Sequence, residues 1–132
     1  MNHLAKTLKK LYCSNKSVNN PSGIDQNGIE SLTCLEVLYA NYNSKICDVN
    51  HLAKTLKKLS CSSNCGINQS GIQHLTDLKV LDIYGNKKIT NINHLANTLI
   101  ILDCKKSGVY PKNLKNMVKL KRKSSTHGEF KT

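Results

Sequence analysis

The chain has 132 residues, which is enough for one domain but not for two separate cores. No stretch reaches 18 consecutive apolar residues, and no basic-then-apolar segment begins the chain, so the sequence indicates neither a membrane-spanning helix nor a secretory signal. The 20 basic residues exceed the 8 acidic ones, but nine of the basic residues and one of the acidic residues lie in 105–132, so the positive charge belongs mostly to the end of the chain.

The chain repeats itself from its first residues onward. Residues 2–11 and 50–59 both read NHLAKTLKKL, and residues 93–102 read NHLANTLIIL. In between, residues 22–38 match residues 65–81 at 10 of 17 positions. This copying predicts an array of similar structural units.

A shorter period of 21 to 27 residues lies inside the long one. Each unit has the form L-x-x-L-x-(Cys, Ala or Ile), in which apolar residues alternate with outward ones, as in a short strand with one buried face. Five units predict five strands, and they begin at Leu8, Leu35, Leu56, Leu78 and Leu99. Three units have an asparagine at the ninth position: Asn43, Asn64 and Asn86. In the first unit Asn15 comes one position early, and in the last unit Ser107 replaces the asparagine.

This pattern resembles the leucine-rich-repeat family, in its short class of about 21–22 residues per repeat. The resemblance covers roughly residues 1–110 and implies a right-handed α/β solenoid with a parallel inner sheet and short 3₁₀ or irregular outer turns. One repeat cannot bury its own apolar face, so stacked neighbours build the core. In this family the asparagines form a ladder that satisfies backbone groups from turn to turn.

Residues 111–132 form a basic C-terminal cap or tail in this interpretation. Leu114, Met117, Val118 and Lys121 recur at helical spacing, which predicts an amphipathic cap over the last layer. The cluster KLKRK contains Lys119, Lys121, Arg122 and Lys123, a composition used for nuclear import or for binding phosphate backbones. A basic, nucleic-acid-associated or nuclear-targeted protein that acts through 105–123 is therefore the alternative function.

The cysteines, histidines and acids give no enzyme or metal motif. Cys13, Cys61 and Cys104 share the strand position of Ala40 and Ile83, which predicts small buried side chains rather than ligands. Four histidines each precede the buried leucine of an outer half-turn: His3, His51, His74 and His94. They occupy a repeated position of the array, whereas a catalytic histidine needs one special position. Asp82 and Asp103 could stand side by side, but an open face gives no desolvated pocket for acid–base work. We expect no catalysis, no cofactor and no metal site.

The outward strand positions offer a surface instead. Positions three, five and seven of each unit should form columns on the concave face, and three of the five tyrosines fall in them. Exposed tyrosine with valine and isoleucine is typical of protein-binding patches, although the same residues also favour strands. We expect non-catalytic protein–protein binding through this face. The expected partner-binding residues are Tyr12, Val37, Tyr39, Asn41, Val80, Asp82, Tyr84, Ile101 and Asp103.

The chain starts within a repeat, because NHLAKT is the outer half of a unit without a strand. Solenoid ends need caps, so the sequence is either a fragment of a longer array or a decayed paralogue, or its open end stacks end to end on another chain. Because the cysteines are expected in the core and the sequence indicates no secretory signal, we expect a reducing, intracellular location, cytoplasmic with the nucleus as the alternative. Abundant lysine and asparagine suggest an AT-rich genome, such as that of an amoeba or of a giant virus, for which the location would be the host cytoplasm.

Overall fold

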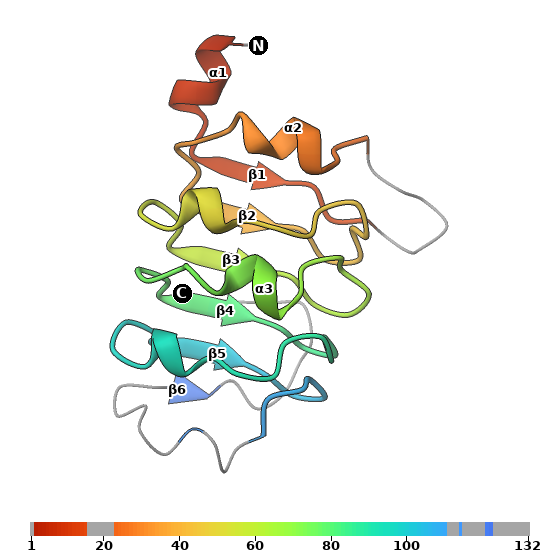
Figure 1. Cartoon of the computed structure of the whole chain (residues 1–132), viewed down its shortest axis with the longest axis vertical. Helices are drawn as coiled ribbons and strands as arrows, with labels where there is room; N and C mark the ends of the chain where they lie inside the picture. Colours follow the sequence, from red (N-terminus) through yellow and green to blue (C-terminus); the bar gives the residue numbers. More distant parts are fainter. Residues whose placement is uncertain (1, 16–22, 111–113, 115–120, 123–132) are drawn as a thin grey trace.

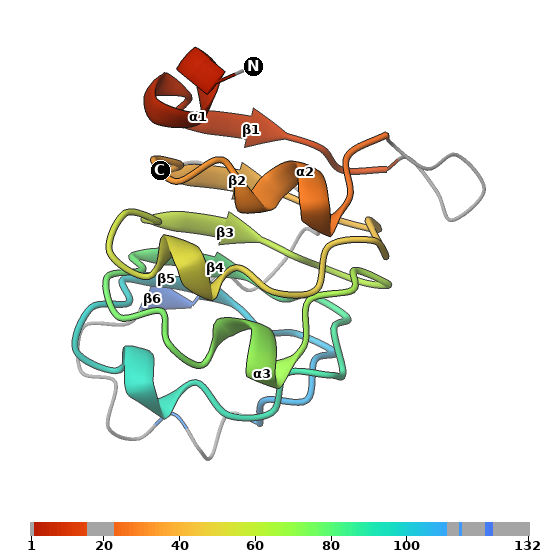
Figure 2. The same cartoon turned by 45° about the horizontal axis from the view of Figure 1, so that its top comes forward.

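A computed structural model of the chain describes residues 2–15, 23–110, 114 and 121–122. Its sheet has six strands, all parallel, in the order β1-β2-β3-β4-β5-β6, and the helices lie on one side of it (Figure 1). Turned by 45°, the strands form a curved stack (Figure 2). The strands are β1 (Lys10–Tyr12), β2 (Val37–Tyr39), β3 (Lys58–Ser60), β4 (Val80–Asp82), β5 (Ile101–Asp103) and β6 (Lys121–Arg122). The helical segments are α1 (Asn2–Thr7), α2 (Gln26–Glu30), η1 (Asn50–Leu52), α3 (Gln69–Ile72) and η2 (Asn93–Leu95).

The five strands predicted from the repeats are confirmed, and so is the parallel solenoid. Each predicted unit contributes one strand, and equal positions pair across all five. The leucines of successive units face the helices and form one continuous core with the apolar residues of the outer half-turns. Leu38, Leu59 and Leu81 are fully buried, which stabilises the fold by roughly 1.5–3 kcal/mol per side chain.

The outer half-turns alternate between α-helix and 3₁₀-helix. Asp25 and Asn68 cap α2 and α3, because their side chains accept hydrogen bonds from Gly28 N and Gly71 N at 2.9 and 3.0 Å. The 3₁₀ segments η1 and η2 have no such side-chain cap. The expectation of only 3₁₀ or irregular outer turns was therefore incomplete: the capped turns are short α-helices.

The asparagine ladder exists at two of its three predicted rungs. Asn43 Nδ2 donates to the carbonyls of Cys13 and Ile24, and Asn86 Nδ2 donates to those of Cys61 and Ile67, at 2.9–3.2 Å. Both asparagines are fully buried. They satisfy carbonyl groups that the turn would otherwise leave unpaired in the core.

The third predicted rung, Asn64, is wrong. Its side chain is exposed, and Cys65 occupies the buried ladder position, where its Sγ accepts a hydrogen bond from Ile67 N. The unit carries one additional residue after Ser63, whose φ of 60° matches the left-handed position of Tyr42 and Gly85 in neighbouring units. The additional residue shifts the ladder by one position, so Asn64 falls outside it.

The last repeat keeps part of the ladder. Ser107 Oγ accepts from Val109 N, as a ladder asparagine accepts from the residue two positions later, but its short side chain donates to Cys104 within its own repeat. Beyond it, Leu114 is buried in the core, and β6 pairs with β5. The predicted helix therefore does not include Lys121–Arg122, because the edge of β5 offers backbone groups that a strand can satisfy. Met117 and Val118 lie outside the described residues.

Candidate partner-binding face

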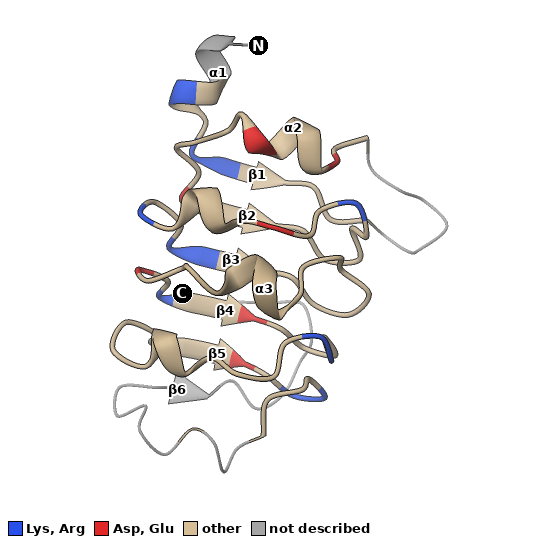
Figure 3. Cartoon of the chain, in the orientation of Figure 1, with Lys and Arg blue, Asp and Glu red and all other residues tan. Residues whose placement is uncertain are grey.

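The sheet face away from the helices carries the predicted columns. Strand pairing places Lys10, Val37, Lys58, Val80 and Ile101 in one column and Tyr12, Tyr39, Ser60, Asp82 and Asp103 in the next. The charges along this face are unequal: β1 and β3 begin with lysine, whereas β4 and β5 end with aspartate (Figure 3). The first three strands therefore carry positive charge in these columns, and β4 and β5 carry negative charge.

The first strands present a stacked pair of tyrosines. The rings of Tyr12 and Tyr39 lie 4.7 Å apart, centroid to centroid, with an angle of 13° between their planes. The Nζ of Lys58 lies 5.4 Å from the centroid of the Tyr39 ring, within the range of a cation–π contact. Tyr12 is 67% exposed. The strand register thus holds a large aromatic surface in place and leaves one end of it open to a partner.

Two residues after Tyr39, hydrogen bonds fix the side chain of Asn41. Its Oδ1 accepts from Ser60 Oγ and from Ser62 N, both at 2.8 Å. Its backbone N–H donates to Ser14 Oγ at 2.9 Å. Asn41 is therefore held in one orientation before any partner arrives. We call the surface formed by Lys10, Tyr12, Val37, Tyr39, Asn41 and Lys58 the tyrosine platform.

The later strands do not present the open surface expected of them. Val80, Asp82 and Asp103 are only 7%, 1% and 3% exposed. The aspartates bond back to their own strand ends: Tyr84 N donates to Asp82 Oδ1, and Lys105 N donates to Asp103 Oδ1. Short side chains in this conformation lie along the sheet instead of projecting from it. These three residues are corrected from expected contact residues to buried ones.

The remaining expected contact residues, Tyr84 and Ile101, are half-buried. The Nζ of Lys106 lies 5.9 Å from the Tyr84 ring centroid. They stand two or more strands from the Tyr12–Tyr39 pair, so the structure does not place all the expected contact residues in one exposed patch.

Of the basic cluster at the end of the chain, only the backbone of two residues is described. Lys121 and Arg122 form β6, in register with Ile101 and Leu102 of β5. Lys119 and Lys123 lie outside the described residues. Half of the proposed targeting motif is therefore part of the sheet in this structure.

The thiols of the repeat core are poor ligands and poor nucleophiles. Burial raises the pKa of the Cys13 thiol to about 11 and that of Cys65 to about 12. Burial also raises the pKa of Cys61 well above its usual value. Reaction and metal binding need the thiolate. Within the described part of the chain, no three histidine, cysteine or acidic side chains are grouped so that they could hold a metal ion.

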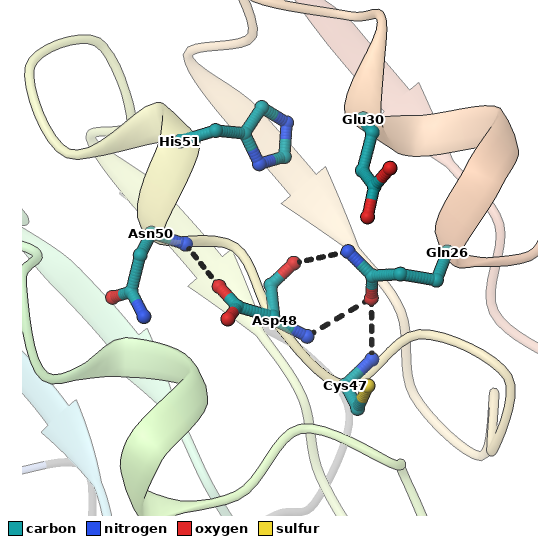
Figure 4. Close-up of a pocket in the computed structure, with 6 residues that line it drawn as sticks. All are labelled: Gln26, Glu30, Cys47, Asp48, Asn50 and His51. Atoms are coloured by element: carbon teal, nitrogen blue, oxygen red, sulfur yellow. Dashed lines mark hydrogen bonds between the residues drawn. The ribbon is translucent and has the colours of Figure 1, made fainter.

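A hollow on the helix side was not anticipated from the sequence. It has a volume of about 540 Å³ and lies between α2 and η1 (Figure 4). Gln26 organises it: Cys47 N and Asp48 N donate to its Oε1 at 2.8 and 3.0 Å, and its Nε2 donates to Asp48 O at 2.8 Å. Asn50 N donates to Asp48 Oδ1. One side chain thus ties two successive repeats together.

The same hydrogen bonds recur one long repeat later, around Gln69. Thr90 N and Asn91 N donate to its Oε1, and its Nε2 donates to Asn91 O. The equal positions of Gln26 and Gln69 in the long repeat were the sequence signal for this role. Because the bonds persist where the thiol and the carboxylate are absent, they serve the fold. Glu30 and His51 also line the hollow.

Comparison with known families agrees with this geometry. A family model described as leucine-rich repeats in two copies matches residues 54–97, which include β3 and β4. Residues 54–97 are leucine-rich repeats. The same strand register continues through β1, β2 and β5 of the leucine-rich-repeat array. No curated protein sequence gave a significant match. Among the described residues, the chain has no helix long and apolar enough to cross a membrane.

Proposed function

We propose that this chain is a non-catalytic protein-interaction module that binds its partner through the tyrosine platform. Leucine-rich repeats generally mediate protein–protein interaction and are typically non-catalytic. The observation that carries the proposal is the stacking of the exposed Tyr12 ring on the half-buried Tyr39 ring. Tyrosine rings give a large contact area for little loss of side-chain entropy, and binding hot spots are enriched in them.

The pre-organisation of the platform supports this function. The tyrosines are held by strand register and by each other, and Asn41 is held by three hydrogen bonds. A surface that is already ordered loses less entropy when it binds. The proposal therefore concerns β1 to β3 and leaves out the buried Val80, Asp82 and Asp103.

Photo-crosslinking tests whether this face binds a protein. A photoreactive phenylalanine analogue replaces Tyr12 in one variant and Tyr110 in another, since these tyrosines are 67% and 61% exposed and only the first belongs to the platform. In a lysate of the native cells, we expect a protein adduct from position 12 and none from position 110. An adduct from position 110 alone would place the interface elsewhere.

The isolated partner then allows an affinity measurement. Tyr39→Ala should weaken binding by about 2 kcal/mol or more, because it removes half of the stack at a hot spot. His74→Ala, on the helix side, should change binding by less than about 0.5 kcal/mol, as ordinary surface substitutions do. His74 is a better control than His51, whose ring lies 3.1 Å from the Ile29 carbonyl oxygen and thus contributes to the fold. The reverse ranking would contradict the proposal.

A further inference from the structure

The tyrosine platform carries two lysines and no acidic residue. The platform residues Lys10, Tyr12, Val37, Tyr39, Asn41 and Lys58 include no aspartate or glutamate. Next to them, Ser60 and Ser62 are buried, and Ser60 Oγ also lies 3.2 Å from Oδ2 of the buried Asp82. Within the described chain the ammonium groups of Lys10 and Lys58 form no ion pair, whereas Lys9 and Lys57 pair with Glu36 and Asp77. The two unpaired charges share one column, two strands apart.

Asn41 adds a directed donor to these charges. Because its Oδ1 already accepts two hydrogen bonds, its Nδ2 must point the other way. Within the described part of the chain, that amide nitrogen donates to no other group. The platform therefore offers an oriented N–H pair two residues along the chain from Tyr39, and an oxygen acceptor from a partner would satisfy it.

We infer that the partner segment is an acidic, extended peptide whose carboxylates contact Lys10, Lys58 and Asn41. The inference rests on the proposed function and specifies the partner's chemistry. Carboxylates accept charge-assisted hydrogen bonds from ammonium and amide groups. The tyrosine faces carry negative charge density, so the carboxylates lie at the rim and an apolar or aromatic partner residue covers the exposed Tyr12 ring.

The spacing of the lysines suits an extended chain. Two strand separations place the Lys10 and Lys58 backbones about 10 Å apart, which is about the length of three residues of extended peptide. A segment in the polyproline II conformation has three residues per turn and rises about 3.1 Å per residue, so residues three positions apart point to the same side. Two acidic residues at this spacing, on such a segment crossing the strands, can therefore meet both lysines.

The decisive variant is Asn41→Asp. A carboxylate has the shape of the amide and keeps the two acceptor contacts to Ser60 and Ser62, but it replaces the free N–H pair with negative charge. Asn64→Asp is the matched control, since it makes the same chemical change at an exposed turn off the face. A second pair compares Lys10→Gln/Lys58→Gln with Lys54→Gln/Lys87→Gln, which remove two charges on and off the platform.

The probe is a blocked decaglutamate, with decaglutamine as the neutral peptide, titrated onto the full chain and followed by tyrosine fluorescence and by backbone amide chemical shifts. Denaturation midpoints verify that every variant is folded. Asn41→Asp places a negative charge against the glutamates, and Lys10→Gln/Lys58→Gln removes two of their positively charged partners. We therefore expect each of these two variants to weaken decaglutamate binding about tenfold or more. Each control should change it less than about twofold, as distant exposed charges are screened.

Equal losses for the on-face and off-face variants would mean that the probe follows net charge, and the inference would be wrong. The inference is also wrong if decaglutamine binds as tightly as decaglutamate. If a protein adduct forms at position 12 but Asn41→Asp leaves that protein's affinity unchanged, the acidic partner is overturned while the proposed function stands. Absence of any adduct at position 12 counts against both.

Discussion

Two identical ten-residue segments, 2–11 and 50–59, begin with different structures in this molecule, although both end in a strand. The first contains the α-helix α1, and the second contains the 3₁₀ segment η1. Leu56 and Leu59 of the second segment are buried, at 1% and 0% exposure, whereas their counterparts Leu8 and Leu11 are only partly buried. Identical local propensities thus produced two conformations, so the neighbouring layers decide between them.

The contacts of the second segment explain the difference. Asn50 Nδ2 donates to Ser70 O, and His74 N donates to Asn50 Oδ1, both toward the next layer. On the other side, the ring of His51 lies 3.1 Å from the Ile29 carbonyl oxygen of the preceding layer. A segment held from both sides follows the stack, and helix propensity over so few residues is too weak to oppose it.

The largest expected difference between the copies concerns the core leucines. Leu59→Ala should lower the free energy of unfolding by about 2–5 kcal/mol, because it leaves a cavity in a layer packed on both sides. Leu11→Ala should cost about half as much or less, since part of that side chain is already solvated. Urea denaturation measures both, and equal costs would show that the two layers are equally packed.

The cysteine that follows each segment gives a kinetic comparison. Cys13 and Cys61 occupy the same strand position, and burial raises the pKa of both thiols. Alkylation at pH 8 therefore requires local opening, which is easier in less protected layers. We expect iodoacetamide to modify exposed Cys47 first, then Cys13, and Cys61 last, as located by peptide mass spectrometry. Modification of Cys61 before Cys13 would contradict the comparison.

Asn50 tests the bridge between layers. Asn50→Ala should cost about 0.5–1.5 kcal/mol, because it removes two hydrogen bonds to the α3 turn. The third copy provides the control: the side chain of Asn93 is exposed and makes no hydrogen bond within the described chain. Asn93→Ala should therefore change thermal stability by less than about 0.5 kcal/mol. A similar loss for both variants would show that the bridge contributes nothing specific.

The smallest effect is expected where the two copies agree. Lys9 pairs with Glu36 and Lys57 with Asp77, each at 3.4 Å and each well exposed. Lys9→Ala and Lys57→Ala should each change the free energy of unfolding by less than about 0.5 kcal/mol, because exposed ion pairs contribute little and are screened by salt. A loss above about 1 kcal/mol that persists in 0.5 M salt would contradict this.

The repeat pattern predicted the strands well because a leucine spacing that recurs in phase defines both the strand and its buried face. Tyr12 and Tyr39 were correctly placed in one column, although their stacking depends on side-chain conformation that spacing does not specify. The burial of Asp82 and Asp103 could not be predicted, since a carboxylate in an outward column can project or bond back to its strand. Asn64 was misplaced because a fixed count from the leucine cannot detect one additional residue in a turn.

The additional residue at Asn64 has a practical consequence. It lies between left-handed Ser63 and buried Cys65, yet β3 and β4 still pair Leu59 with Leu81 in the common register. The rim of the solenoid at this turn therefore tolerates a change of length without transmitting it to the sheet. This makes the turn a natural grafting point, where an epitope or a labelling peptide could be inserted for detection while the opposite end of the sheet remains unaltered.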